Sequence, residues 1–425
     1  MFEKMKIPFL IILLFSMKCF SQEPCKTASL PVVFVHGFLA SGDTWSAQLQ
    51  RFSSNGYCDN RLFVFDWNTL GGKAKNDSLL DVFINAVLQK TNSSKIDLVG
   101  HSAGGGLCYG YLKDSARAMK TAHYAHVGSS KMTGPAGYNG NVPTINIYSD
   151  GDKVLSGADV SGVTNIRQSG NDHLQVASGA ETFAALYEFF TGGKKPSVVS
   201  IIPSNEDLIT IAGRAVTLGE NKPLKGAGIF IYEYDPVKGR RKNRTSPTAL
   251  ITDENGYWPS VKIRKGTYLE MELHPDTGRV VSYFIEPPVR DNRNIYLRGI
   301  TADGMAGALL RALPGREDQC AIAVFSSNQA IISGRDSVMA GDFSLSIPSL
   351  AQAGKTIIAS FLFDDGDGIS GGKPIKSFGP GIFFNGVDMM IPADKKKTFR
   401  IYFNGRSIAL PCRAGKEAVM VAIFN

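Results

Sequence analysis

A serine enclosed by glycines is the first feature of this sequence that could carry chemistry. The segment Lys95–Leu112 runs from an apolar stretch into GHSAG, with Ser102 at its centre, and then directly into a helix-like pattern. A sharp turn from strand to helix needs small residues on both sides of the serine, because a Cβ there would clash. The following helix would direct its N-terminal amides at the serine, where its dipole favours negative charge. The motif predicts either a nucleophile or only a tight turn, and the rest of the chain must decide.

A nucleophilic serine needs a histidine as base and a carboxylate to orient that histidine. In a strand–turn–helix arrangement, the acid and then the base should follow Ser102, each on a loop after a late strand. The loop after the apolar segment INIYS presents Asp150 and Asp152, and the segment before the last helical pattern presents His173. We predict Ser102, Asp152 and His173 as the catalytic residues. Asp152 is preferred because it lies inside the loop, and Asp150, at the strand end, stays the alternative.

The same chemistry needs two N–H donors for the oxygen that becomes negatively charged. We predict that the amide of Ala103, the residue after the serine, is one of them. The other is expected in the segment VFVHGFLASG, where Gly37 lets the backbone turn and the Phe38 amide face the pocket. The apolar side chains expected to bind substrate at the mouth of the site are Leu39, Trp67 and Leu70.

Strand-like and helix-like segments that would position these residues alternate from residue 31 to about residue 191. The strands expected at 32–36, 61–67 and 96–100 are almost continuously apolar, and a helical pattern covers 77–90. Continuous apolar strands that alternate with helices are typical of a parallel sheet covered on both faces. The N-terminal region is therefore predicted to be an α/β domain.

The pattern changes at a segment rich in Gly, Lys, Pro and Ser near residues 191–207, which is interpreted as a linker. Beyond it, short alternating segments are separated by turn signals such as DENG, which predicts β-sandwich structure. The expected divisions are a signal peptide at 1–21, an α/β catalytic domain at 22–195, a β-sandwich at 205–300 and a second β-rich domain at 301–425.

The first 21 residues are predicted to be a secretory signal peptide. They begin with lysines and contain an apolar core of about eleven residues, which is too short to span a bilayer comfortably. Cleavage near Ser21 would make the protein secreted or periplasmic; a retained anchor helix is the alternative. The formal net charge of +8 is too mild to indicate a nucleic-acid partner.

The chain has 6 cysteines, of which Cys19 falls in the predicted signal peptide. The odd number left in an exported chain leaves at least one thiol without an intramolecular partner. Cys108 lies on the apolar face of a helix and is expected to be a buried free thiol. The pairings considered for the others are Cys25 with Cys58 and Cys320 with Cys412.

These motifs resemble those of the α/β-hydrolase superfamily, through VFVHGF, GHSAGG, DGDKV and NDHLQ. Over residues 31–210 the chain looks like the archaeal carboxylesterase/lipase that carries a C-terminal β-domain. This resemblance implies Ser102 as nucleophile, His173 as base, and Phe38 and Ala103 as oxyanion donors. Residues 208–300 resemble a transthyretin-like or carboxypeptidase-regulatory-like sandwich, which is usually an accessory module.

Two departures from the family bear on function. The segment 125–132, from which some lipases take the acid, has no carboxylate, and this supports Asp152. The segment DWNTLGGKAKNDSLL leaves no room for a lid, which argues against interfacial lipase behaviour. Together with the signal peptide and the apolar residues expected at the mouth of the site, the resemblance predicts an exported serine ester hydrolase that acts on esters with apolar acyl chains. A polyhydroxyalkanoate-type polyester depolymerase and a non-catalytic lipid- or polymer-binding protein on a hydrolase scaffold are the alternatives.

No cofactor and no metal is expected at the serine site. Two roles stay open for the β-rich region: completing the acyl pocket, or binding a lipid or polymer surface. Asp364, Asp365 and Asp367 are close enough in sequence to suggest a calcium loop. The twelve-position pattern with its closing glutamate is absent, so an ordinary turn is favoured there.

Overall fold

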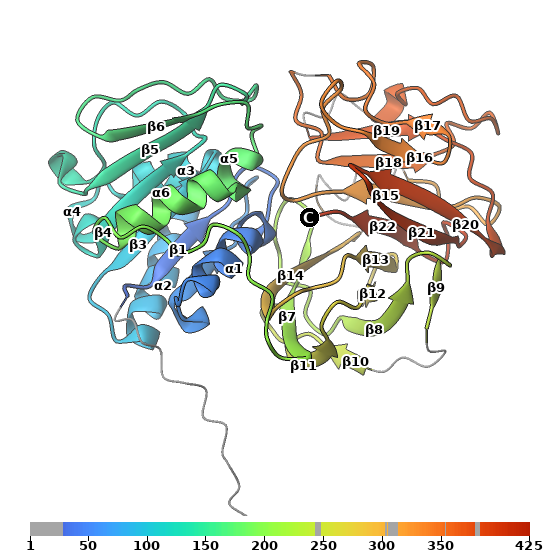
Figure 1. The fold of residues 1–425 in the computed structure, drawn as a ribbon, viewed down its shortest axis with the longest axis horizontal. Helices are drawn as coiled ribbons and strands as arrows, with labels where there is room; N and C mark the ends of the chain where they lie inside the picture. The colour runs from blue at the N-terminus through green and yellow to red at the C-terminus, as the bar shows by residue number, and fades with distance from the viewer. Residues whose placement is uncertain (1–28, 243–247, 302–303, 305–312, 353, 379–382) are drawn as a thin grey trace, which may run out of the picture.

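The computed structural model describes residues 29–242, 248–301, 304, 313–352, 354–378 and 383–425. The predicted signal peptide at 1–21 lies outside these residues. A part made of a sheet and helices stands beside a part made of strands (Figure 1). No helix within the described ranges is long and apolar enough to cross a membrane.

The N-terminal part is built on a six-stranded sheet in the order β2-β1-β3-β4-β5-β6, and every neighbouring pair is parallel. All residues of β1, β3 and β5 are buried, as expected for apolar strands covered on both faces. The predicted α/β-hydrolase architecture is confirmed. The strands are β1 Val32–Val35, β2 Leu62–Phe65, β3 Ile96–His101, β4 Thr121–Val127, β5 Thr144–Ser149 and β6 Thr164–Gln168.

Helices cover both faces of this sheet, and the alternation within β1 shows how. Val33 and Val35 join a core that includes α2 and α3, whereas Val32 and Phe34 join a core that includes α1 and α6. Successive strand residues point to opposite faces, so one strand supports both cores. The helices are α1 Ser46–Ser54, α2 Lys73–Thr91, α3 Ala103–Tyr111, α4 Ser115–Met119, α5 Gln175–Ser178 and α6 Ala180–Phe190, with 3₁₀ turns η1 Gly42–Trp45, η2 Asp59–Arg61, η3 Tyr138–Gly140 and, in the β-rich part, η4 Lys376–Phe378.

The C-terminal part is composed almost entirely of strands. They are β7 Leu208–Thr217, β8 Gly228–Asp235, β9 Arg240–Arg241, β10 Thr248–Ile251, β11 Tyr257–Arg264, β12 Leu269–His274, β13 Val281–Ile285, β14 Asn292–Gly299, β15 Ala321–Phe325, β16 Val338–Ala340, β17 Phe343–Ser344, β18 Ala359–Phe363, β19 Phe384–Asp388, β20 Asp394–Phe403, β21 Arg406–Cys412 and β22 Val419–Ile423. They form a nine-stranded sheet, β10-β8-β12-β13-β22-β15-β18-β19 with β9 on β8, and two smaller sheets, β11-β7-β14 and β17-β16-β20-β21.

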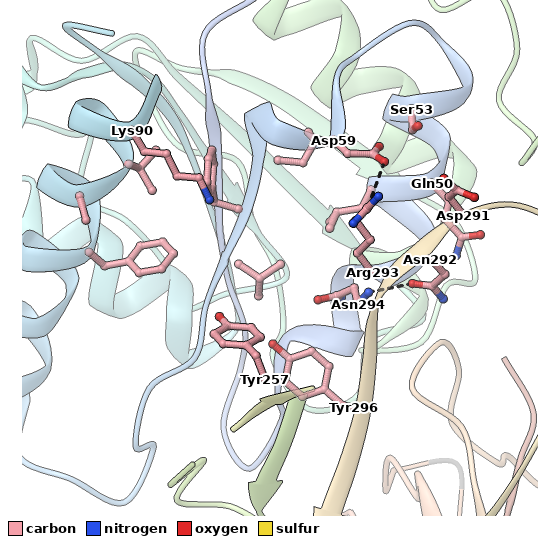
Figure 2. Close-up of a pocket in the computed structure, with 17 residues that line it drawn as sticks. Gln50, Ser53, Asp59, Lys90, Tyr257, Asp291, Asn292, Arg293, Asn294 and Tyr296 are labelled. Carbon is pink, nitrogen blue, oxygen red and sulfur yellow. Dashed lines mark hydrogen bonds and ion pairs between the residues drawn. The ribbon is translucent and has the colours of Figure 1, made fainter. Parts of the chain in front are cut away.

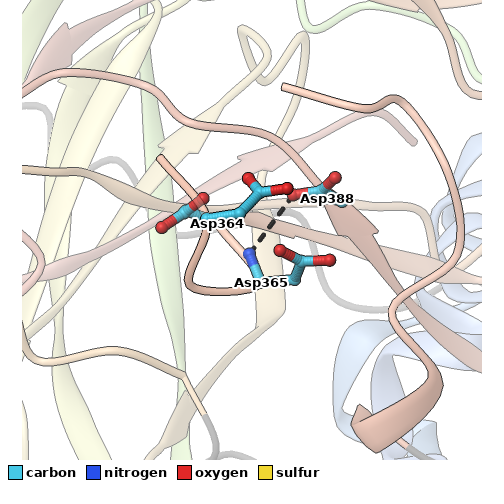
Figure 3. Close-up of side chains that lie close together, drawn as sticks. Asp364, Asp365 and Asp388 are labelled. Carbon is cyan, nitrogen blue, oxygen red and sulfur yellow. Dashed lines mark hydrogen bonds between the residues drawn. The ribbon is translucent and has the colours of Figure 1, made fainter. Parts of the chain in front are cut away.

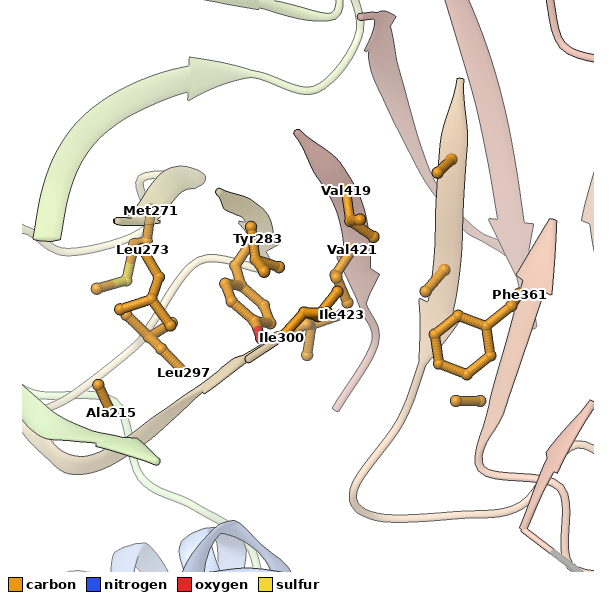
Figure 4. Close-up of a cluster of buried hydrophobic side chains, with 14 of the residues drawn as sticks. Ala215, Met271, Leu273, Tyr283, Leu297, Ile300, Phe361, Val419, Val421 and Ile423 are labelled. Carbon is orange, nitrogen blue, oxygen red and sulfur yellow. The ribbon is translucent and has the colours of Figure 1, made fainter. Parts of the chain in front are cut away.

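The last strand, β22, lies between β13 and β15 and pairs in parallel with both. The segments at 205–300 and 301–425, predicted as separate β-rich domains, therefore share one continuous sheet. Their main core lies between this sheet and the β11-β7-β14 sheet, with Met271 and Leu273 beside Leu297 and Ala215 (Figure 4). The domain divisions themselves stay a prediction.

Buried polar contacts dock the β-rich part on the α/β part. Arg298 of β14 donates to both oxygens of Asp43, at 2.9 and 2.6 Å. Asp66, after β2, accepts hydrogen bonds of 2.5 Å from Arg214 and from Tyr296. Removing one partner of such a buried pair leaves an uncompensated charge, which typically costs about 3–5 kcal/mol. The two parts are therefore packed together, and are more than tethered neighbours.

The states of the cysteines among the described residues confirm one prediction and contradict another. Cys108, Cys320 and Cys412 are buried free thiols. The prediction for Cys108 is confirmed, and the pairing of Cys320 with Cys412 is wrong, since both are free thiols and that of Cys320 donates to the Pro392 carbonyl at 3.8 Å. The pairing of Cys58 with Cys25 involves a residue outside the described ranges and stays a prediction.

Candidate active site

Ser102 occupies a strained turn between β3 and α3. Its φ of 53° and ψ of −125° are unusual for a residue with a side chain. A Cβ at Gly100 would lie 2.7 Å from the Gly104 oxygen, and one at Gly104 would lie 2.3 Å from the His36 oxygen. Strain of this kind costs about 1–3 kcal/mol and persists where the surrounding structure imposes it. The glycines of the GHSAG motif are thus required by packing, and they hold the serine at the carboxyl end of the sheet.

The structure brings Ser102, His173 and Asp152 together in one chain of hydrogen bonds. His173 Nε2 lies 2.9 Å from Ser102 Oγ, and His173 Nδ1 lies 2.7 Å from Asp152 Oδ2. Asp152 Oδ1 accepts the amides of Val154 and Leu155 at 2.8 and 3.1 Å. With its carboxylate on Nδ1, the histidine carries its proton there and leaves Nε2 to accept the serine hydroxyl proton. All three side chains belong to buried residues.

The surroundings of these three side chains favour an ionised Asp152 and a neutral His101. Burial alone would raise the pKa of Asp152, but hydrogen bonds from His173 and from two backbone amides outweigh it and lower the pKa. Burial, with the nearby His173, lowers the pKa of His101 to about 3. His101 is therefore neutral near pH 7, and its Nε2 donates to the His173 carbonyl at 2.8 Å. It supports the histidine loop without adding a second charge.

Asp150, the alternative acid, lies elsewhere. It is on the surface, where both its oxygens accept from Arg167 Nε at 2.8 and 3.0 Å. Its side chain is 45% exposed, whereas that of Asp152 is 1% exposed. The carboxylate that is hydrogen-bonded to His173 is therefore that of Asp152, and not that of Asp150.

The predicted oxyanion donors flank the serine. A Cβ at Gly37 would lie 2.9 Å from the Cβ of Ser102, so only glycine allows this close approach. Among the described residues, neither the Phe38 amide nor the Ala103 amide donates to an acceptor in the protein. The first amides of a helix have no partner within the helix, and this explains Ala103. Both N–H groups are therefore without an acceptor among the described residues.

The β-rich part holds the loop that carries Phe38, a feature that the sequence analysis missed. Asn221, which is 5% exposed, reaches into this loop from the turn after β7. Its Oδ1 accepts from Ser41 Oγ at 2.5 Å, and its Nδ2 donates to the carbonyls of Ala40 and Trp67 at 2.9 and 3.0 Å. No local signal could have revealed this contact, because Ser41 and Asn221 are 180 residues apart.

The three predicted substrate-binding residues lie at different depths. Trp67 is buried, stacks on His36 and donates from Nε1 to the His36 carbonyl at 3.0 Å, so it packs against the residue that follows β1. Leu70 is partly buried in the β2–α2 loop, where its amide donates to Asn68. Leu39 lines a small apolar cavity together with Leu174, the residue after His173. A binding role for each of these residues stays a prediction.

Two cavities among the described residues lie away from Ser102. One of about 360 Å³ opens between β2, α1, α2 and the start of β14, with Lys90 and Tyr257 at its wall (Figure 2). Another of about 280 Å³ lies between η1, α1 and the strand ends of the β-rich part. Neither cavity is lined by a residue of the Ser102–His173–Asp152 chain. Hydrogen-bond geometry, and not cavity size, therefore identifies this site.

Two segments of the chain match protein families. Residues 29–118 match the family described as Lipase (class 2), and residues 207–301 match the family described as Lipase C-terminal domain. The first match covers the GHSAG turn and the loop that carries Phe38. The second covers the segment that resembles a transthyretin-like sandwich and contains Asn221.

Several solved structures are similar to the chain. Aspergillus fumigatus lipase B is 15% identical, with 41% of this chain covered, 55% of that chain and a TM-score of 0.32. The mature form of the Bacillus licheniformis lipase BlEst2 is 15% identical, with 40% and 94% covered and a TM-score of 0.33. Naproxen esterase from Bacillus subtilis is 13% identical, with 38% and 84% covered and a TM-score of 0.30.

The fold and the family matches together define a class. The sheet order is that of the α/β-hydrolase fold, and the two family matches support a carboxylic ester hydrolase, with a lipase-type N-terminal part followed by a β-rich C-terminal part.

Proposed function

We propose that the protein is an exported serine hydrolase of esters with apolar acyl chains, and that Ser102, His173 and Asp152 are its catalytic triad. The observation that carries this proposal is the pair of hydrogen bonds made by His173, of 2.9 Å to Ser102 Oγ and 2.7 Å to Asp152 Oδ2. In addition, the amides of Phe38 and Ala103 donate to no acceptor among the described residues. A structural serine would need neither the strained backbone nor the open amides.

The reaction follows from these positions. Ser102 Oγ attacks the acyl carbon while His173 Nε2 takes its proton, and Asp152 stabilises the imidazolium that forms. The amides of Phe38 and Ala103 donate to the developing oxyanion, and loss of one such donor typically costs about 3–4 kcal/mol in the transition state. His173 then gives the proton to the departing alcohol. Water, activated by His173, attacks the acyl-enzyme, and the acid leaves with Ser102 restored.

Apolar side chains next to the histidine support an apolar acyl group. Leu39 and Leu174 line a cavity of about 20 Å³ with Leu218 and Phe325 of the β-rich part. Leu218 and Phe325 also line a neighbouring apolar cavity of about 60 Å³, further into that part. We infer that the β-rich part completes the acyl site.

Export is the part of the proposal that rests on sequence alone. Residues 1–21 have the lysine-rich start, short apolar core and small residues of a secretory signal peptide. N-terminal sequencing of the protein secreted by its host tests this part. A mature chain that begins after Ser21 supports export, and a chain that keeps residues 1–21 contradicts cleavage.

Hydrolysis of p-nitrophenyl esters of increasing acyl length tests the activity. The wild type should prefer acyl chains longer than acetyl, and Ser102→Ala should lose turnover. Asp152→Asn should lower kcat by about 10⁴-fold, because the neutral amide would favour the wrong histidine tautomer. Asp150→Asn, the matched surface control, should stay within about twofold of the wild type. Wild-type protein without turnover would favour a binding protein on a hydrolase scaffold.

A further inference from the structure

Four aspartates gather at one edge of the nine-stranded sheet, outside the ester hydrolase site. Asp364 directly follows β18, and Asp388 ends β19, which is the parallel neighbour of β18 with Phe363 opposite Asp388. The carboxyl ends of parallel strands meet at the same edge, and the crossover after β18 adds Asp365 and Asp367. One carboxylate oxygen from each aspartate lies within 4.8 Å of the others. Figure 3 shows three of these side chains at this edge.

Two of the four carboxylates are buried with little positive charge beside them. Asp388 is 0% exposed and Asp364 is 5% exposed. Lys373 Nζ lies 3.6 Å from Asp388 and 3.7 Å from Asp365, and Arg316 lies 3.9 Å from Asp364. These are long contacts, and both basic side chains are about half exposed. Buried carboxylates are costly unless they are closely paired or bind a metal ion.

A buried carboxylate oxygen without a hydrogen bond gives a second, independent indication. Asp364 Oδ2 is buried and accepts no hydrogen bond among the described residues, its nearest cation being Arg316 Nη1 at 3.9 Å, whereas Oδ1 accepts the Gly368 amide at 2.9 Å. By contrast, both oxygens of Asp388 accept backbone amides, from Asp365 at 3.2 Å and Gly371 at 3.0 Å. A buried anionic oxygen without a donor needs another source of positive charge.

We propose that Asp364, Asp365, Asp367 and Asp388 bind a Ca²⁺ ion. The cluster offers only oxygen ligands, which suit hard cations. Ca²⁺ binds oxygens at about 2.3–2.6 Å, so ligands on opposite sides of it lie about 4.6–5.2 Å apart, and the observed spread of at most 4.8 Å fits within that span. Mg²⁺ would require a tighter octahedron of about 4.2 Å across.

The ion ties the β18–β19 crossover to the sheet edge. The loop FDDGDGISGG lacks the spacing of a complete calcium loop, and the ligand from the next strand, Asp388, supplies what the loop lacks. The site is therefore assembled by strand pairing, and not by a continuous motif.

Calorimetric titration and thermal unfolding of the full-length protein, first treated with EGTA, test this proposal. In wild type, 1 mM CaCl₂ should release or take up heat with saturation and raise Tm by at least about 3 °C, while 1 mM MgCl₂ should shift Tm much less. Asp364→Asn and Asp388→Asn should lose both responses. Asp342→Asn, an exposed aspartate in the β16–β17 turn, is the matched control and should keep both.

The same variants distinguish a metal site from a merely structural cluster. In EGTA, Asp364→Asn should unfold at the wild-type Tm or above it, because it removes a repulsive buried charge. Asp367→Asn alters only an exposed side chain, so it should fold normally and bind Ca²⁺ at least about tenfold more weakly, since affinity follows the number of charged ligands. The proposal is overturned by a wild type that shows neither heat nor a Tm shift with CaCl₂. A shift that survives in Asp364→Asn and Asp388→Asn, or an equal shift with MgCl₂, overturns it as well.

Discussion

Replacing Asn221 tests whether the β-rich part takes part in catalysis by positioning the oxyanion loop. Asn221 has a φ of 53°, a conformation that glycine adopts without strain, so Asn221→Gly removes the side chain and preserves the turn. The side chain makes hydrogen bonds of 2.5, 2.9 and 3.0 Å to Ser41, Ala40 and Trp67. At about 1 kcal/mol net for each hydrogen bond, its loss removes about 3 kcal/mol of attachment between the parts.

Only a fraction of that free energy should appear in the reaction barrier. Deletion of an oxyanion donor costs about 10²–10³ in kcat, but Asn221→Gly displaces the Phe38 amide and does not delete it. A displaced reacting group can cost up to about 10²-fold. We therefore expect kcat for p-nitrophenyl esters to fall about 10- to 100-fold, with KM within about threefold, since the donor acts mainly on the transition state.

The matched control is Asn139→Gly. Asn139 has a similar φ of 57°, is exposed and makes no side-chain hydrogen bond within the described part of the chain, so its kcat should stay within about twofold of the wild type. If Asn221→Gly lowers Tm while kcat is unchanged, Asn221 only docks the two parts and the positioning argument is refuted.

Three further outcomes are expected. Gly37→Ala would set a Cβ 2.9 Å from that of Ser102, so kcat should fall at least about 100-fold with little change in Tm; near wild-type kcat would contradict the close approach. Arg298→Ala would leave the Asp43 carboxylate buried without its partner and should lower the free energy of unfolding in urea by about 3–5 kcal/mol; a loss below about 1 kcal/mol would show that this pair does not dock the parts. Burial opposes ionisation of Asp152, but its hydrogen bonds prevail and lower its pKa, so its stabilising contribution is present above about pH 4 and is lost as the pH falls through the lowered pKa. Asp152→Asn should therefore flatten the loss of stability below about pH 4, and an unchanged acid limb in urea unfolding would contradict this linkage.

The α/β part could be predicted because the patterns that indicate its strands and helices each lie within a short segment of the sequence. Continuous apolar strands and helical periods fix a parallel sheet, and parallel strands end at a common edge. Ser102, Asp152 and His173 were therefore found from their order and their loops, and the structure brings them together. The choice between Asp150 and Asp152 was also reached from position within the loop, which decides whether the side chain points inward.

The β-rich part carries information that no local pattern contains. Alternation predicts that β22 is a strand, but not that it enters the sheet between β13 and β15. Asn221 contacts the loop that carries Phe38, and Asp388 joins the aspartate cluster, only because segments distant in sequence are brought together. The sequence analysis missed both residues. A pairing of Cys320 with Cys412 was considered because both lie in the C-terminal region, and the structure has them as free thiols.

Covalent trapping of the nucleophile tests the central claim most directly. The protein should be incubated with a p-nitrophenyl alkylphosphonate, digested and mapped by mass spectrometry. We expect one phosphonyl group per chain, on Ser102, formed together with complete loss of esterase activity and greatly slowed in His173→Ala. A label on another residue, or inactivation of the esterase with Ser102 unmodified, would contradict it.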